Sequence, residues 1–122
     1  MNLKVIDNEF SVCKINNIND VNLNDEFVFI SKTDEEISLV CTTENVPKEC
    51  ISVEHNWNGF RIEGELDFSL IGIISKVSTI LAENKIGIFV ISTYNTDYIL
   101  VKKDSMRDTI SVLEDQGYKF IV

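Results

Sequence analysis

The stretch that most constrains the fold is residues 88–101, in which two apolar runs are joined by a short polar segment. Residues 88–92 are apolar on both alternating faces, which is typical of a central strand covered on both sides. Residues 95–97 have turn-forming side chains, and residues 98–101 form the second apolar run. The sequence therefore predicts a tight apolar hairpin over residues 88–101.

A similar segment occurs earlier in the chain. Residues 27–40 align with residues 88–101 without a gap at an offset of 61 residues, and Glu36 then aligns with Asp97. Four aligned pairs are identical: Ile30 and Ile91, Ser31 and Ser92, Leu39 and Leu100, and Val40 and Val101. This alignment makes an internal duplication the first hypothesis for the architecture.

Length and charge narrow the class of protein. A chain of 122 residues can bury one core, either as a single domain or as two small lobes that share a sheet. The formal net charge of -9 and the lack of a basic cluster argue against nucleic acid or an anionic membrane as a partner. The sequence contains no membrane-length apolar run and no signal-peptide pattern at its start. We therefore expect a cytoplasmic protein that binds neither nucleic acid nor membranes.

Cysteine and histidine usage gives no sign of a metal, a cofactor or catalysis. Cys13, Cys41 and Cys50 are odd in number and lack CxxC spacing, so we expect reduced thiols. His55 is the only histidine, and a zinc site would need carboxylates to complete it. No serine or cysteine motif surrounds His55, so we predict no catalytic residue and a protein that is not an enzyme. The acidic run at residues 34–36 lacks the glycine of a calcium loop and is interpreted as a solvated turn.

The first half of the chain has mostly strand patterns. In chain order we predict a strand at 9–15, a polar loop at 16–26 with at most one helical turn, a hairpin from 27–31 and 37–41, a short helix at 46–50 with Pro47 at its first position, a strand at 51–55, and a junction at 56–59. The loop stands where the second half has a full helix. We therefore interpret the first half as a reduced copy of the second.

The second half alternates strands and helices. We predict a strand at 60–63, a helix from Ser69 or Leu70 to Asn84, the hairpin strands at 86–93 and up to 102, a second helix from a cap at Asp104 or Ser105 to Gly117, and a last strand at 118–122. The first helix has apolar residues at helical spacing on one side. This order predicts an α+β, ferredoxin-like βαββαβ fold with an antiparallel sheet and helices on one face.

Two of these segments resemble the ACT domain. They are residues 65–73 (ELDFSLIGI), which enter the first helix, and residues 91–101 (ISTYNTDYILV), which form the hairpin. The resemblance is greatest to the small tandem-ACT proteins that include the arginine sensors of animal cells. Residues 29–40 resemble the first ACT repeat of that group, so the resemblance covers roughly residues 10–117.

The resemblance implies two fused ACT-like lobes, a reduced one at residues 1–57 and a complete one at residues 58–122. It also implies a non-enzymatic, allosteric sensor module that binds a small amino acid at the loop between the first strand and first helix. Such modules commonly pair, so that the site lies at a lobe or subunit interface. A homodimer and a regulated protein partner are therefore expected.

The residues themselves support a site at this loop, with two interpretations for its main members. Gly72 lies in the first turn of the predicted helix, where glycine costs about 1 kcal/mol relative to alanine. Its missing Cβ either lets a ligand carboxylate approach the helix N-terminus or allows close packing of helix on sheet. Asp97 either accepts hydrogen bonds from a ligand ammonium group or only caps the turn, and Asp67 and Ser69 also suit simple helix caps. The candidate ligand-binding residues are Asp67, Phe68, Ser69, Gly72, Ile73, Thr93, Tyr94, Asn95, Thr96 and Asp97.

The sequence gives one expectation about the side chain of the ligand and leaves open an alternative without a ligand. The arginine sensors have an acidic residue where this chain has Leu70, so an uncharged ligand side chain is expected in place of arginine. The alternative is a ligand-free interaction module, in which a sheet edge or helix face builds a dimer. The final strand, which includes Phe120, would then pair across the dimer interface.

Overall fold

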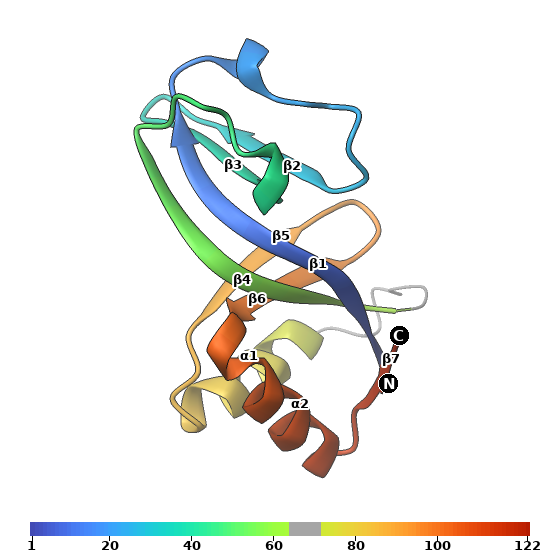
Figure 1. The fold of residues 1–122 in the computed structure, drawn as a ribbon. Coiled ribbons are helices and arrows are strands. Elements are labelled where there is room, and N and C mark those ends of the chain that lie inside the picture. Colours follow the sequence, from blue (N-terminus) through green and yellow to red (C-terminus); the bar gives the residue numbers. More distant parts are fainter. Residues whose placement is uncertain (64–71) are drawn as a thin grey trace. The chain divides into compact units, whose positions relative to one another are not determined.

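The computed structural model describes residues 1–63 and 72–122. The chain divides into two compact units, which we call the inserted unit (Asn8–Trp57) and the terminal unit (Met1–Asp7 with Asn58–Val122). Two long strands, β1 (Asn2–Ile15) and β4 (Ser52–Ile62), contribute residues to both units (Figure 1).

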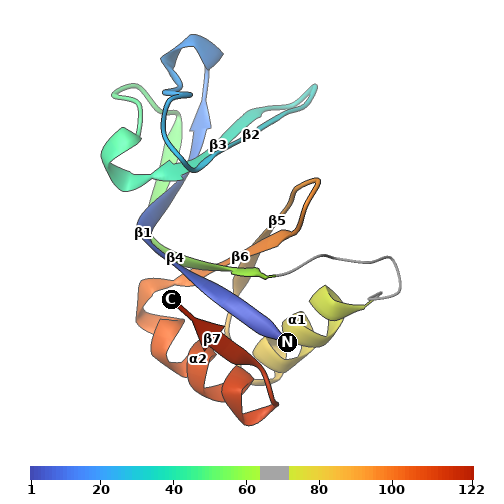
Figure 2. The same ribbon diagram turned by 90° about the vertical axis from the view of Figure 1, so that its right-hand side faces the viewer.

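The terminal unit has the predicted α+β, ferredoxin-like fold. Its elements are β4, α1 (Ile73–Glu83), β5 (Ile88–Ser92), β6 (Asp97–Lys102), α2 (Met106–Asp115) and β7 (Lys119–Ile121), which is the βαββαβ order. The strands lie in the order β7, β1, β4, β6, β5, and both helices lie on the same side of them (Figure 2). The last strand, β7, pairs in parallel with the start of β1 in the same chain, from Asn2 opposite Lys119 to Lys4 opposite Ile121.

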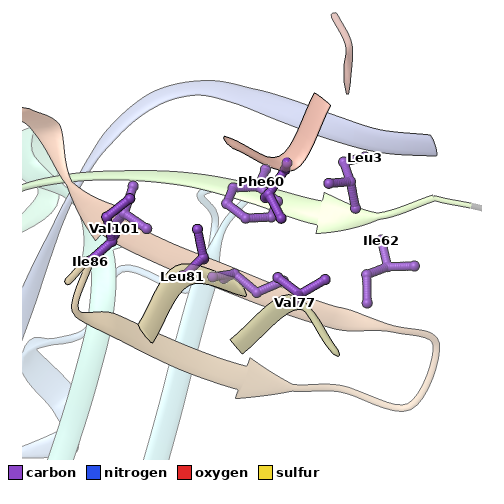
Figure 3. Close-up of a cluster of buried hydrophobic side chains, with 9 residues drawn as sticks. Leu3, Phe60, Ile62, Val77, Leu81, Ile86 and Val101 are labelled. Carbon is purple, nitrogen blue, oxygen red and sulfur yellow. The ribbon is translucent and has the colours of Figure 1, made fainter. Parts of the chain in front are cut away.

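The core of the terminal unit lies between its strands and its helices (Figure 3). Alternate residues of β4 and β6 face the helices, which is the period that a half-covered strand imposes. The ring of Phe60 packs edge-on against Phe120 at a centroid distance of 5.4 Å. The cluster of buried residues contains Leu3, Phe60, Ile62, Val77, Leu81, Ile86, Ile99, Val101 and Leu113.

Both helices end through a residue in the left-handed conformation. Gly117 has a φ of 94°, and the Tyr118 N–H donates to the carbonyl of Leu113 over 3.1 Å, so the predicted glycine stop is confirmed. At the end of α1 the same position is Lys85, with a φ of 61°, and the Ile86 N–H donates to Leu81.

The second helix has the predicted residue Ser105 at its N-cap, but without the side-chain hydrogen bond expected of a cap. A 3₁₀ turn, η4 (Lys103–Ser105), precedes α2, and Ser105 makes no side-chain cap hydrogen bond. Its backbone carbonyl instead accepts a hydrogen bond from Thr109 Oγ1 over 2.8 Å. Ser105 already has helical backbone angles, whereas a capping side chain needs an extended backbone at this position.

The inserted unit keeps the strands but lacks the α-helices of the terminal unit in its described elements. Its strands lie in the order β2 (Val28–Lys32), β3 (Ile37–Thr42), β1, β4, with antiparallel pairing from β2 to β3 and from β3 to β1. The predicted single helical turn in the polar loop is confirmed as η1 (Ile18–Asp20). The small core contains Cys13, Ile15, Leu39 and Cys41.

The predicted short helix at residues 46–50 is wrong. The helical turn, η2 (Thr43–Asn45), comes before Pro47, and residues 46–50 are not helical. A residue that precedes proline is driven to the extended region, and Val46 has a φ of -62° and a ψ of 127°. The Ile51 N–H then donates to the carbonyl of Lys14 over 2.8 Å, which holds the chain against β1.

The predicted junction at residues 56–59 is part of one continuous strand. The strands expected at 51–55 and 60–63 are both contained in β4, and the first strand starts at Asn2 and not at residue 9. Asn56 has a φ of 70°, a conformation that asparagine tolerates better than most residues. Sheet pairing therefore outweighs the turn preference of the Asn and Gly residues here.

The two predicted hairpins are confirmed, but their offset is 60 residues and not 61. The last ladder pair is Lys32 with Ile37 in one hairpin and Ser92 with Asp97 in the other. A shift of one residue exchanges the two faces of a strand. The identities found at an offset of 61 therefore join residues on opposite faces.

Candidate functional site

The turn between β5 and β6 is held by two threonines that the sequence analysis selected. The Thr93 N–H and hydroxyl both donate to the carbonyl of Thr96, over 2.8 Å and 2.9 Å. Thr96 is buried, and its hydroxyl donates to the carbonyl of Ile62 over 2.7 Å. This bond ties the turn to the end of β4, the strand from which the chain continues towards α1.

The other candidate residues of this hairpin differ in their surroundings, and Asp97, expected in the turn, is the first residue of β6. Tyr94 and Asn95 are exposed, and the side chain of Tyr94 is fully open to solvent. Asp97 is half-buried, and its Oδ1 accepts a hydrogen bond from the hydroxyl of Ser92 over 2.6 Å. Asp97 shares its strand face with Ile99 and Val101, which point into the core beneath the helices. The carboxylate therefore lies at the end of the helix-covered face of the sheet.

Gly72 is the N-cap of α1, which begins at Ile73, so the prediction that Gly72 lies within the first helical turn is wrong. Its φ of 89° is in the left-handed region, which only glycine adopts at no cost. A Cβ at Gly72 would meet no atom within 4 Å among the described residues, so close packing against the sheet does not explain the glycine. Ile73 follows as the first residue of α1 and packs on the core.

The remaining three predicted site residues, Asp67, Phe68 and Ser69, lie outside the described residues, as does Leu70. The described part of the candidate site therefore consists of Gly72, the start of α1 and the β5–β6 turn. The α1 crossover connects the parallel strands β4 and β5, so the N-terminus of α1 and this turn lie at the same end of the sheet (Figure 2).

A cluster near this turn was missed from the sequence. Arg61 Nε donates to Glu63 Oε2 over 3.0 Å, and Arg61 Nη1 donates to the hydroxyl of Tyr98 over 3.3 Å. The guanidinium carbon lies 5.9 Å from the centre of the Tyr98 ring, and the hydrogen bond to Glu63 raises the pKa of Arg61. In the sequence, the charged residues Arg61 and Glu63 alternate with the apolar residues Phe60 and Ile62, and this alternation could have revealed the cluster.

The three cysteines lie in the inserted unit as free thiols. Burial raises the pKa of Cys13 to about 12 and that of Cys41 to about 11, so both stay protonated at neutral pH. Cys50 is half-buried, and its Sγ donates to the carbonyl of Pro47 over 3.2 Å. Within residues 1–63 and 72–122, no cluster of three or more metal-binding side chains is arranged to hold a metal ion.

None of the helices in the described part of the chain is long and apolar enough to span a membrane.

The family of the chain follows from this fold and from comparison with family models. A model of the ACT domain matches residues 52–115, and a model of an N-terminal domain matches residues 8–49. The first match covers more than half of the 122 residues, so the chain belongs to the ACT domain family. It is a small protein of the tandem ACT-like type, and ACT domains are regulatory modules.

Solved structures agree with this assignment. A protein from Agobacterium tumefaciens is 28% identical with a TM-score of 0.88, over 98% of this chain and 91% of that one. A Vibrio cholerae protein described as a possible transport protein is 20% identical with a TM-score of 0.74, over 93% and 88% of the two chains. The ligand-free regulatory subunit of aspartate kinase from Thermus thermophilus has a TM-score of 0.65 at 6% identity, over 94% and 96%. The last two show the fold alone, and none of the curated proteins matches the sequence.

Proposed function

We propose that this protein is a regulatory sensor that binds a small amino acid between the start of α1 and the β5–β6 turn. The observation that carries the proposal is the hydrogen bond from Thr96 Oγ1 to the carbonyl of Ile62 over 2.7 Å. It fixes the turn beside the strand end that leads to the helix N-terminus. Polar side chains and the N-terminus of a helix thus occur at one end of the sheet.

The proposed contacts follow from the two charges of an amino acid. The ligand carboxylate is bound by the backbone N–H groups at the start of α1, where the helix dipole favours an anion and the left-handed Gly72 leaves open space. The ammonium group is bound by the carboxylate of Asp97, with Thr93 and Asn95 as further polar contacts. Asp67, Phe68 and Ser69 complete the proposed site. An uncharged ligand side chain is proposed because this chain has Leu70 at the position where the arginine sensors have an acidic residue.

We further propose that ligand binding biases self-association or a contact with a regulated protein partner. The proposed lobes are residues 1–57 and 58–122. In support, the compact units meet between Trp57 and Asn58, although Met1–Asp7 groups with the later residues.

The first experiment is a thermal-shift screen against the twenty amino acids at two protein concentrations. A ligand present at about a hundred times its dissociation constant adds about 2.7 kcal/mol, which raises the melting temperature of a chain of this size by several degrees. One clear hit identifies the ligand class. No hit, together with a melting temperature that rises with protein concentration, contradicts the sensor.

Asp97→Asn then tests the site itself. The amide oxygen of asparagine can still accept the hydrogen bond from Ser92, so the change removes the charge and keeps the ladder contact. We expect the amino acid identified in the screen to bind at least roughly tenfold more weakly to this variant, with little change in melting temperature. Asp108→Asn on α2 is the charge-matched control. If Asp97→Asn binds normally, Asp97 is only a turn residue.

A ligand-free interaction module is the second candidate. In its favour, β5 stands at the end of the strand order and carries the exposed Val90. This candidate predicts dimerisation that is indifferent to amino acids, and Val90→Lys then disrupts the dimer in analytical ultracentrifugation. One edge of β7 pairs with β1 in the same chain, so pairing across a dimer interface would use the other edge of β7.

A further inference from the structure

The inserted unit contains a pocket where β3 passes into η2. Its volume is about 370 Å³, and it is lined by Asn8, Glu9, Thr42, Thr43 and Glu44. This volume falls in the lower part of the range of about 300–1,000 Å³ that small-molecule sites occupy. None of the lining residues belongs to the amino-acid site proposed above.

The pocket lies where one face of the sheet changes from apolar to polar. Ser11 pairs with Cys41 and Cys13 pairs with Leu39, so these four side chains share the face that forms the small core. The same alternation puts Glu9, two residues before Ser11, on this face. The core therefore continues into a polar region at the pocket.

One wall of the pocket is held by a chain of hydrogen bonds. The hydroxyl of Thr43 lies 2.9 Å from Ser11 Oγ and donates to the carbonyl of Glu9 over 3.3 Å. Ser11 is fully buried, and its Oγ lies 2.7 Å from His55 Nδ1. These contacts fix the Thr43 hydroxyl before any ligand arrives, which lowers the entropic cost of binding.

Thr42, another lining residue, is held by a partly buried contact with a carboxylate. Thr42 Oγ1 donates to Asp25 Oδ2 over 2.6 Å, and Asn45 Nδ2 donates to the same oxygen over 2.7 Å. The hydrogen bond from Thr42 lowers the pKa of Asp25, so this carboxylate stays charged well below neutral pH. With Glu9 and Glu44 in the lining, the pocket has a negative potential, and none of its lining residues is basic.

We propose that this pocket binds a small organic cation that carries a primary ammonium group and a hydroxyl group, the chemistry of an amino alcohol. Glu44 binds the ammonium group, the charges of Glu9 and Asp25 add to the attraction, and the hydroxyl groups of Thr43 and the ligand pair. Only two carboxylates line the pocket, and the described residues contain no metal-binding cluster, so a hard metal ion fits less well.

The test is an NMR titration of the isotope-labelled full chain with ethanolamine. We expect saturable shifts of the amide signals of residues 8–9 and 42–45, and unmoved signals at residues 93–97. Ethylene glycol has the hydroxyl group without the charge, and propylamine has the charge without the hydroxyl group. We expect ethanolamine to bind more tightly than either compound, by roughly tenfold or more over ethylene glycol.

Three variants make the test specific. Glu44→Gln should weaken the binding of ethanolamine by roughly tenfold. Glu49→Gln removes the same charge from an exposed position outside the pocket and should leave the binding of ethanolamine unchanged. Thr43→Val should remove the preference for ethanolamine over propylamine.

The proposal is overturned if ethanolamine causes no saturable shift, if ethylene glycol binds as well, if calcium ions shift the same signals more strongly, or if Glu49→Gln weakens binding as much as Glu44→Gln. Shifts confined to residues 93–97 would overturn it while supporting the amino-acid site. Failure of the amino-acid site leaves the result at this pocket unaffected, because the two sites share no residue.

Discussion

The two hairpins of this protein have the same backbone pattern and differ in what holds their turns. In each hairpin a threonine follows the last ladder pair, and its N–H donates across the turn, from Thr33 to Glu36 and from Thr93 to Thr96. Thr96 is buried and its hydroxyl donates to β4, whereas Glu36 at the equivalent position is exposed. The hairpin geometry is therefore local, and its attachment depends on the surrounding unit.

The units around the hairpins differ in the same way. Among the residues that the structure describes, α1 and α2 cover the sheet of the terminal unit over one cluster of nine buried residues, whereas the cluster around Cys13 and Leu39 in the inserted unit has four. The inserted unit has 3₁₀ turns, η1 and η2, in place of helices. A hairpin of the same geometry can thus form without α-helices over its sheet, but with less apolar burial to stabilise it.

The largest expected effect comes from the two cores. Phe60→Ala removes a fully buried ring that packs on Phe120, and we expect unfolding free energy to fall by about 3–5 kcal/mol. Leu39→Ala in the smaller core should cost about 2–3 kcal/mol, because fewer neighbours surround the cavity.

Two signals separate the units in urea unfolding. Circular dichroism at helical wavelengths reports on α1 and α2 of the terminal unit, and fluorescence of the single tryptophan, Trp57, reports on the inserted unit. Phe60→Ala should move the first transition more than the second, and Leu39→Ala the reverse. Equal movement of both transitions by each variant would show that the units unfold as one.

The next effect concerns the turn attachment. Thr96→Val keeps the shape of the side chain but leaves the Ile62 carbonyl without its hydroxyl donor, which should cost about 1–3 kcal/mol. Glu36→Val at the equivalent exposed position should change stability by less than about 0.5 kcal/mol. Thermal unfolding measures both changes, and similar losses would show that the two turns are held alike.

The smallest effect is chemical and leaves stability unchanged. Burial raises the pKa of Cys13 and Cys41, to about 12 and about 11, so their reactive thiolate forms are scarce at pH 8. In iodoacetamide labelling of the folded protein followed by mass spectrometry, Cys50 should react first, and the other two only after urea is added. Rapid labelling of Cys41 would show that the inserted unit opens readily.

Much of the fold was predictable because its signals are local. The apolar runs on either side of the β5–β6 turn, the helical spacing of α1 and the stop at Gly117 follow from side-chain period and backbone preference. The positions of Thr93 and Thr96 in a turn were also predictable. The anchor from Thr96 to Ile62 was not, because it joins residues 34 apart in sequence.

The errors have a common physical cause. The boundary between the units does fall within residues 56–59, but β4 continues through them without the expected break, and the helix expected at residues 46–50 is replaced by η2 before Pro47. In each case pairing with a distant strand or a backbone restriction outweighed local preference. The offset of 61 residues was wrong for a similar reason. It matches identical residues, but these residues lie on opposite faces of the two hairpins.

The sequence by itself determined the class of fold, the elements with strong period and the hairpin that contains Asp97, because these depend on neighbours along the chain. Only the tertiary structure decided that β7 pairs with β1, that Thr96 attaches its turn to β4, and that Ser11, Thr43 and Asp25 hold the walls of a pocket. Such contacts join distant segments, and their partners are chosen by register and burial, which no local pattern records.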